Sequence, residues 1–247
     1  MKLTVLDSGS RANGYVLHDD REALVLECGC TYARCLEAVG FDRRKIVGAL
    51  VTHEHGDHCR YIEQYLEAAI PTLTSNGTVE NWPFKKPIRP RIVECLKTYQ
   101  LGGFKVMAFD TQHDSAEPIG FLIQHEAIGT LLFATDTYYL KYKFDDLTQI
   151  MIECNYDNGI LERNVEAGVI KPFVKDRIKQ SHMSLETTIS TLKANDISRV
   201  NNVVLLHLSS NNSDSDMFKT KVEESVGKMV TVARKGVSLS FNKEMTL

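Results

Sequence analysis

Short apolar runs separated by polar turns make up most of the N-terminal third of the chain. Strands are expected where these runs occur, at residues 2–7, 15–18, 23–26 and 46–51. The last run is nearly all apolar, which is typical of a strand buried on both faces. Leu36 and Val39 share one side of a helix expected over residues 31–40, which ends at Gly40. This third of the chain therefore combines strands with helices.

The same combination continues towards the C-terminus. Further strands are expected at residues 71–74, 104–109, 120–125, 130–135, 149–154 and 202–206, with two more within 229–241. Helical spacing predicts helices over residues 57–69, 184–195 and 214–226, and residues 158–180 are expected to be helical or irregular. The order suits an α/β fold, a four-layer αββα sandwich of two mixed sheets flanked by helices. The periodicity alone fits other α/β layerings equally well.

Length and charge limit the class of protein. The chain has 247 residues, 43% of them hydrophobic, which is enough for a single α/β domain spanning residues 1–247. Its formal net charge is −3, and no basic tail indicates a polyanion partner. A nucleic-acid or nucleotide substrate would therefore need positive charge from a local source, such as bound metal ions.

Cysteine usage and the N-terminus indicate a compartment. The six cysteines show no paired CxxC spacing, so free thiols in a reducing environment are expected. The N-terminus enters a strand pattern directly, without the charged and apolar regions of a signal peptide. No apolar run reaches the roughly 18 residues of a transmembrane helix. The expectation is a cytoplasmic protein with no membrane partner.

One segment directly after the apolar run at residues 46–51 is dense in metal-binding groups. Its candidate ligands are His53, His55, Asp57 and His58. Alternate residues of an extended segment point the same way, so His53 and His55 are able to bind one metal ion together. Asp57 and His58 lie where the chain enters the next helix, and Asp57 suits a helix N-terminus. These two residues are therefore able to face a second metal ion.

Three more candidate ligands follow the ends of other apolar strands, where α/β folds build their sites. They are His113, Asp136 and His207. His113 would complete the first metal site, His207 would complete the second, and Asp136 would bridge the two. Zinc accepts this mixture of nitrogen and oxygen ligands, and manganese or iron also tolerates it. Two such ions, about 3.5–4 Å apart, would hold a bridging hydroxide and clamp a phosphate.

Together these motifs resemble the metallo-β-lactamase fold superfamily. The segment His53–His58, placed after an apolar strand, is similar to the signature motif of that superfamily. Similarity to its YycJ/WalJ-like branch extends through residues 6–13, 112–118, 134–137, 153–157, 181–184 and 206–212. The resemblance implies the four-layer αββα fold and the activity of a metal-dependent nuclease or phosphodiesterase.

The resemblance also implies a binuclear metal site. It places His53, His55 and His113 on one ion. It places Asp57, His58 and His207 on the other, with Asp136 as the bridge. His182, within the segment Ser181–Ser184, is implied to lie near the site without binding metal. One departure is Glu27, because the family usually has an aspartate there that orients the ligand histidines.

The favoured hypothesis is hydrolysis of a phosphodiester bond in DNA or another nucleic acid by a hydroxide held between two divalent metal ions. Zn²⁺ is the expected metal, with Mn²⁺ or Fe²⁺ as alternatives. Asp57 and His182 are the candidate catalytic residues, and His182 would donate a proton or bind phosphate. The alternative for His182 is a helix-capping or surface residue. His18 and His125 are expected to be ordinary packed or solvated histidines.

Other functions stay open at this point. A small or cyclic nucleotide is a rival substrate, because one phosphate is all that the metal pair needs. The same hydroxide would also attack the carbonyl carbon of a lactam, lactone or thioester. A metal-binding module without turnover is disfavoured because all seven candidate ligands are present. Residues 75–103, which predict no clear element, are candidates for shaping substrate entry or for forming a homodimer.

Overall fold

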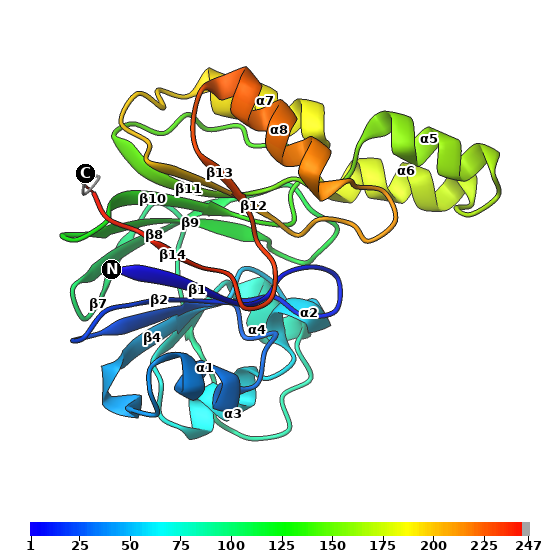
Figure 1. Cartoon of the computed structure of the whole chain (residues 1–247). Helices are drawn as coiled ribbons and strands as arrows, with labels where there is room; N and C mark the ends of the chain where they lie inside the picture. Colours follow the sequence, from blue (N-terminus) through cyan, green and yellow to red (C-terminus); the bar gives the residue numbers. More distant parts are fainter. Residues whose placement is uncertain (244–247) are drawn as a thin grey trace.

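The computed structural model describes residues 1–243 and contains two facing β-sheets with helices on their outer sides (Figure 1). Each sheet has seven strands, in the orders β14-β1-β2-β3-β4-β5-β6 and β13-β12-β11-β10-β9-β8-β7. The predicted four-layer αββα sandwich is confirmed. Within the described residues, no helix is long and apolar enough to cross a membrane.

The first sheet combines antiparallel and parallel pairing. Its strands are β1 (Lys2–Asp7), β2 (Gly14–His18), β3 (Ala23–Leu26), β4 (Ile46–Leu50), β5 (Thr72–Thr74), β6 (Arg91–Ile92) and β14 (Ser238–Ser240). Neighbours from β14 to β3 pair antiparallel, and those from β3 to β6 pair parallel. The parallel half brings the carboxyl ends of β3, β4 and β5 to one edge of the sheet.

The second sheet repeats this division. Its strands are β7 (Thr98–Leu101), β8 (Phe104–Asp110), β9 (Ile119–His125), β10 (Gly129–Ala134), β11 (Leu147–Glu153), β12 (Asn202–Leu206) and β13 (Val230–Val232). Neighbours from β7 to β10 pair antiparallel, and those from β10 to β13 pair parallel. The carboxyl ends of β10, β11 and β12 therefore also meet at one edge.

Helices cover the outer face of each sheet, and one pair projects from the body. On the first sheet they are α1 (Tyr32–Ala38), the 3₁₀ turn η1 (Arg43–Lys45), α2 (Gly56–Cys59), α3 (Ile62–Glu67) and α4 (Asn76–Asn81). On the second sheet lie α7 (Leu185–Ala194) and α8 (Ser215–Val226). The projecting pair is α5 (Asn158–Glu166) and α6 (Pro172–Ser181), hereafter the α5–α6 hairpin (Figure 1).

The central strands of both sheets are buried on their two faces, because helices lie on one side and the other sheet on the second side, whereas the edge strands β6, β7 and β14 are largely exposed. In β11, Ile150 and Ile152 pack towards the helices, whereas Met151 between them packs towards the first sheet. In β12, Val203 and Val204 divide in the same way. This alternation explains why the strands are nearly continuous apolar runs in the sequence.

Two expectations about secondary structure differ from what the structure shows. The helix expected over residues 57–69 is divided into α2 and α3, because the Tyr61 amide donates to the Cys28 carbonyl, 2.9 Å away, and not within a helix. Asp57 lies in the first turn of α2, whose N-cap is His55, so it does not cap the helix, but its carboxylate is at the helix N-terminus as the dipole argument predicts. Residues 75–103 are more regular than expected and include α4, β6 and β7.

Candidate metal centre

The candidate ligands come together at the edge where the parallel strands of both sheets end. His53 follows β4, Asp136 follows β10 and His207 follows β12. Asp136 and His207 have positive φ angles of 46° and 52°, a left-handed conformation that is costly for residues other than glycine. The chain turns sharply at the ends of these two strands, and the strain is concentrated beside the candidate ligands.

Three histidines form the first ligand group, namely His53, His55 and His113. Their nitrogen atoms lie within 4.8 Å of one another. His113 Nδ1 donates to the Ser181 carbonyl at 2.7 Å, which leaves Nε2 as the free ring nitrogen. That Nε2 lies 3.1 Å from His55 Nδ1. Two unprotonated imidazole nitrogens at this distance repel each other unless a proton or a metal cation lies between them.

The second ligand group consists of Asp57, His58 and His207, together with Asp136. One ligand atom from each lies within 4.8 Å of the others. His58 Nε2 lies 3.2 Å from Asp57 Oδ2 and 3.3 Å from Asp136 Oδ1. His207 Nε2 lies 3.3 Å from Asp57 Oδ2. Imidazole and carboxylate groups so close together have the composition of a divalent-metal site.

Asp136 lies between the two groups. Its Oδ1 atom faces the second ligand group, 3.3 Å from His58 and 3.5 Å from His207. Its Oδ2 atom lies 3.7 Å from His113 Nε2, on the side of the first ligand group. The Thr135 hydroxyl donates to Oδ1 at 2.8 Å and fixes the carboxylate. Each oxygen is thus directed to a different group.

His53 tests whether the first ligand group fits a cation. The residue is only 1% exposed, and its Nδ1 atom pairs with the Thr52 hydroxyl at 2.9 Å. Its Nε2 atom is buried and has no hydrogen-bond partner within residues 1–243. A buried nitrogen without a partner is costly, and a metal ion would satisfy it. The residues present therefore fit a metal ion.

Burial and neighbouring charges move the pKa values of the centre in opposite directions. Burial, aided by the charge of His58, holds the pKa of His53 well below its usual range. Burial would also lower the pKa of His207, but Asp136, Asp57 and Glu153 outweigh it and raise that pKa to about 10. The carboxylates of the second ligand group thus attract positive charge, which a metal ion supplies when it replaces the protons.

Glu153 is a site residue that the sequence reasoning did not assign. It ends β11 with no exposed surface, and its Oε1 atom lies 2.7 Å from His182 Nδ1. Its Oε2 atom accepts from the amides of Thr137 and Met183, at 2.8 and 3.2 Å. The sequence signal that could have identified Glu153 is an acidic residue at the end of an apolar strand. Asp136, Glu153, His182 and His207 also offer ligand atoms within 4.8 Å of one another.

His182 lies at the edge of the centre, as the C-cap of α6. Its ring stacks on His207, with centroids 5.3 Å apart, and its side chain is 20% exposed. Burial lowers its pKa, but the Glu153 carboxylate more than offsets this and raises the pKa above its ordinary value. Since Glu153 holds Nδ1, Nε2 is the nitrogen available to another molecule.

Two further side chains support the second ligand group, and one of them is the unusual glutamate. Asn13, fully buried, donates to Asp57 Oδ2 at 3.0 Å, a role that the sequence reasoning also missed. Glu27 is buried with a φ of 67°, and its Oε2 atom lies 3.5 Å from His58 Nδ1. The longer side chain thus still reaches a candidate ligand histidine from behind.

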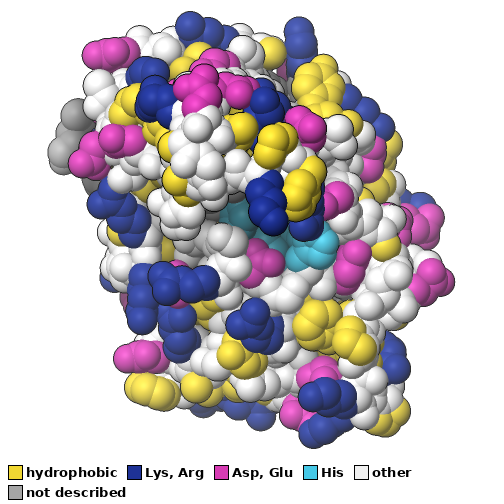
Figure 2. Space-filling view, turned by 90° about the vertical axis from the view of Figure 1, so that its right-hand side faces the viewer, with side chains coloured by type: hydrophobic (Ala, Val, Ile, Leu, Met, Phe, Trp, Pro, Cys, Tyr) yellow, Lys and Arg dark blue, Asp and Glu magenta, His cyan; other side chains and the backbone are white. Residues whose placement is uncertain are grey.

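The centre opens to one face of the molecule. Figure 2, viewed from the side on which the α5–α6 hairpin projects, shows histidine side chains at the floor of a hollow. Basic, hydrophobic and acidic side chains lie on its rim. Next to His207, a cavity of about 430 Å³ is lined by Ser8, Arg11 and Ser210, among others. Histidine side chains are therefore accessible from this face.

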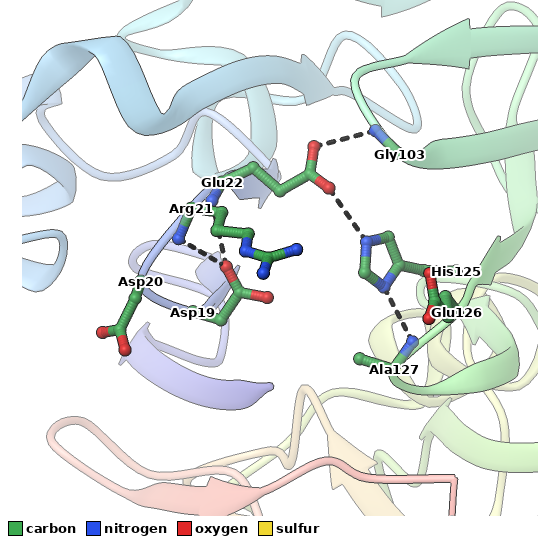
Figure 3. A pocket seen from close by; sticks show the side chains of 8 residues that line it. All are labelled: Asp19, Asp20, Arg21, Glu22, Gly103, His125, Glu126 and Ala127. Carbon is green, nitrogen blue, oxygen red and sulfur yellow. Dashed lines mark hydrogen bonds and ion pairs between the residues drawn. The ribbon is translucent and has the colours of Figure 1, made fainter.

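The remaining two histidines lie elsewhere. His18 Nε2 pairs with the Thr4 hydroxyl at 2.9 Å. His125 Nε2 lies 2.9 Å from Glu22 Oε1, while its Nδ1 accepts from the Ala127 amide, as Figure 3 shows. Glu22, His125 and Ala127 line a cavity of about 480 Å³, where the turn after β2 meets the turn after β9. His125 links the two sheets at this place.

A family model described as the β-lactamase superfamily domain matches residues 34–208 of the chain. That range includes all seven candidate ligands. It also includes Glu153 and His182, and it omits only the first strands of the first sheet and the last helix and strands.

Individual proteins are similar over nearly the whole length. An exodeoxyribonuclease YycJ from Bacillus anthracis is 23% identical over 239 residues, which cover 91% of this chain and 88% of the relative. The metallo-β-lactamase fold protein YhfI from Bacillus subtilis superposes with a TM-score of 0.70 at 15% identity, covering 96% and 98% of the two chains. A diphosphatase of the PhnP family gives 0.66 at 15% identity, covering 98% of each chain. The two structures show a shared fold.

Proposed function

Because the chain belongs to the β-lactamase superfamily domain family, with the metallo-β-lactamase fold, we propose that it is a metal-dependent hydrolase that cleaves phosphodiester bonds in nucleic acid. The observation that carries this proposal is the position of Asp136. Its two oxygens face two separate ligand groups, at 3.3 Å from His58 and 3.7 Å from His113. A carboxylate shared by two metal positions is the arrangement of binuclear phosphatases and nucleases.

Seven side chains would hold the two ions. His53, His55 and His113 would bind the first, Asp57, His58 and His207 would bind the second, and Asp136 would bind both. Zn²⁺ suits these ligands best, and Mn²⁺ or Fe²⁺ is an alternative. When bound, two divalent ions activate water and offset the negative charge of a phosphate. The chain itself contributes the positioning of these side chains and the exclusion of water behind them.

His182 would protonate the leaving oxygen. Its Nδ1 atom is held by Glu153 at 2.7 Å, and its side chain is 20% exposed, which supports an Nε2 atom open to a substrate oxygen. Stacking on His207 keeps the imidazole beside the second ligand group. A positioned imidazole of this kind contributes about 10²–10⁴-fold to turnover. Glu153 would act as a positioning residue, since it fixes the tautomer and orientation of His182.

The activity for which one similar protein is named supports nucleic acid as the substrate class. The relative from Bacillus anthracis is named an exodeoxyribonuclease and is matched along most of both chains. The net charge of −3 favours a second candidate, a phosphodiesterase of small or cyclic nucleotides. A long polyanion binds with a steep salt dependence and a small nucleotide with a shallow one, which distinguishes these two functions.

The test combines metal analysis with a substrate panel. Purified protein would be analysed for metal content, then assayed on bis(4-nitrophenyl) phosphate, labelled DNA, labelled RNA, a cyclic nucleotide and a chromogenic thioester. We expect about two metal ions per chain and hydrolysis of the chromogenic diester and of a nucleic acid. Thioester hydrolysis without any phosphodiester hydrolysis would overturn the proposal. Hydrolysis of the cyclic nucleotide alone would favour the second candidate.

A further inference from the structure

Two exposed tyrosines lie directly beside the candidate metal centre. Tyr138 and Tyr139 follow Asp136 after a single residue, and they are 41% and 52% exposed. We propose that they form a platform on which unpaired bases of a nucleic-acid strand stack next to the scissile phosphate. This inference rests on the proposed function and deepens it, because it names single-stranded nucleic acid as the substrate class.

The backbone of this segment is fixed to the centre. The Tyr138 amide donates to the Gln112 carbonyl at 3.0 Å, next to His113. The Thr137 amide donates to Glu153 Oε2 at 2.8 Å, and the Thr137 hydroxyl donates to the Tyr139 carbonyl at 2.8 Å. The two rings are therefore exposed on a backbone that does not need to be ordered when a ligand binds. Rigid aromatic side chains of this kind bind at a low cost in conformational entropy.

A third tyrosine in the same segment, Tyr142, packs against the rest of the protein, unlike Tyr138 and Tyr139. Tyr142 packs edge-on against Phe109, with centroids 6.0 Å apart, and its hydroxyl donates to Asp110. By contrast, the rings of Tyr138 and Tyr139 have no aromatic neighbour within residues 1–243. Their hydroxyls also make no hydrogen bond to that part of the chain. Two aromatic rings that are consecutive in the sequence and have no such neighbours or hydrogen bonds are available to a ligand.

Basic side chains accompany the rings. Lys141 and Lys143 follow in the same segment, and both are exposed, although Lys141 is paired with Asp110. The α5–α6 hairpin, whose second helix ends next to His182, carries five basic and three acidic side chains, although the whole chain is negative. Three of the five, Lys175, Arg177 and Lys179, are held in ion pairs with Glu162 or Asp114. At its tip Phe173 is 68% exposed, with Lys171 5.9 Å from its ring. Figure 2 shows basic, hydrophobic and acidic side chains around the hollow. Aromatic rings combined with local positive charge are typical of sites for single-stranded nucleic acid.

The platform would require unpaired bases. A ring stacks on the face of a base, and in a duplex that face is covered by the neighbouring base pairs. A blunt duplex would offer only its terminal pair to Tyr138 and Tyr139. A single strand would offer successive bases on one side of the phosphate that lies at the metal centre. Since stacking is worth about 1–3 kcal/mol per base, it is tolerant of sequence and strong enough to select single strands.

The experiment compares three substrates on four proteins. Metal-loaded wild type, the double variant Tyr138→Ala/Tyr139→Ala, the double variant Tyr138→Phe/Tyr139→Phe and the control Phe41→Ala would be assayed. The substrates are a single-stranded 20-mer, the same sequence as a blunt duplex, and bis(4-nitrophenyl) phosphate. Phe41 is a matched control because it is 73% exposed and precedes β4, at the opposite end of that strand from His53.

For the alanine double variant, we expect kcat/KM on the single strand, relative to that on the chromogenic diester, to fall about 10- to 100-fold. The phenylalanine double variant should retain the wild-type ratio, because its rings still stack, and Phe41→Ala should match wild type on all substrates. An unchanged ratio in the alanine variant, or a wild type that prefers the blunt duplex, would overturn the platform and leave the proposed function intact. A metal-loaded wild type that cleaves no phosphodiester would instead overturn the proposed function.

Discussion

His182 Nδ1 lies 2.7 Å from Oε1 of Glu153, a carboxylate with no exposed surface. The two residues come from α6 and β11, which are separated in sequence by α5. Because the carboxylate also accepts two backbone amides, its position is fixed independently of the histidine. An imidazole oriented in this way presents its second nitrogen in a constant direction, which is the requirement for a proton donor.

We therefore predict that His182→Ala lowers the turnover of bis(4-nitrophenyl) phosphate by about 10²–10⁴-fold. The bound metal should stay in place, because all seven proposed ligands remain. Stopped assays with elemental analysis of the same sample measure both quantities. His18→Ala is the matched control, because that histidine contacts Thr4 far from the centre. Unchanged turnover in His182→Ala would exclude the role. Loss of metal would instead assign His182 to the alternative ligand set with Glu153.

Asp136→Ala is predicted to lose bound metal, because its two oxygens face both ligand groups. We expect elemental analysis to find less than half of the wild-type metal content and turnover to fall to background. Asp136 has a φ of 46°, a conformation that asparagine tolerates better than alanine, so Asp136→Asn separates lost charge from backbone strain. Asp19→Ala, in the turn after β2, is the control for removing a distant aspartate. Full metal occupancy in both Asp136 variants would refute the bridging assignment.

Those residues of the candidate metal centre that directly follow apolar strands were predictable from the sequence. The apolar run before His53 is recognisable as a buried strand, and polar ligand types after such a run have few structural explanations. The order of the runs predicts an α/β fold, whereas the choice of four layers over other layerings depended on the family resemblance. Asn13 has no comparable signal. The signal of Glu153, an acid at the end of an apolar strand, does not reveal its role, because both residues act through partners that only tertiary packing brings close. The division between α2 and α3 depends likewise on a hydrogen bond to Cys28, far away in sequence.

Metal binding is predicted to stabilise the protein against heat. Without a cation, His53 Nε2 is buried with no partner among residues 1–243, and His55 and His113 face each other at 3.1 Å. An ion that binds only the folded state at 100 times its Kd adds about 2.7 kcal/mol to the free energy of unfolding. For a chain of this size, that raises Tm by roughly 5–10 °C.

The measurement is a thermal melt in EDTA, followed by a melt after addition of zinc to chelated and dialysed protein. His53→Ala provides the comparison, and its Tm should respond to zinc much less than that of wild type. Equal Tm values for wild type in EDTA and in zinc would contradict the fit of the first ligand group to a metal ion.

We predict that the free energy of unfolding falls in alkaline solution, because several thiols are buried in the folded protein. Burial raises the pKa of Cys30 to about 11 and that of Cys35 to about 12, from an ordinary value of 9.0. Above pH 9 the unfolded chain loses these protons while the folded chain keeps them. The folded state then binds more protons than the unfolded state, so the free energy of unfolding decreases as pH rises. This stabilisation is fully present below pH 9 and is lost progressively towards the folded pKa values.

Between pH 8 and pH 10, each of these two thiols should lower the free energy of unfolding by about 1.4 kcal/mol, because pH 10 lies one unit above the pKa of the thiol in the unfolded chain. Urea denaturation at the two pH values, under reducing conditions and with excess EDTA, measures the total loss, to which His207 also contributes because its pKa of about 10 lies in this range. Cys35→Ala should show a smaller decrease than wild type, because it lacks one titrating thiol. Replacement of the exposed Ser10 by alanine, which removes no titrating group, should leave the decrease as in wild type. If the free energy of unfolding of wild type is equal at pH 8 and pH 10, these cysteines do not retain their protons in the folded state as their burial requires.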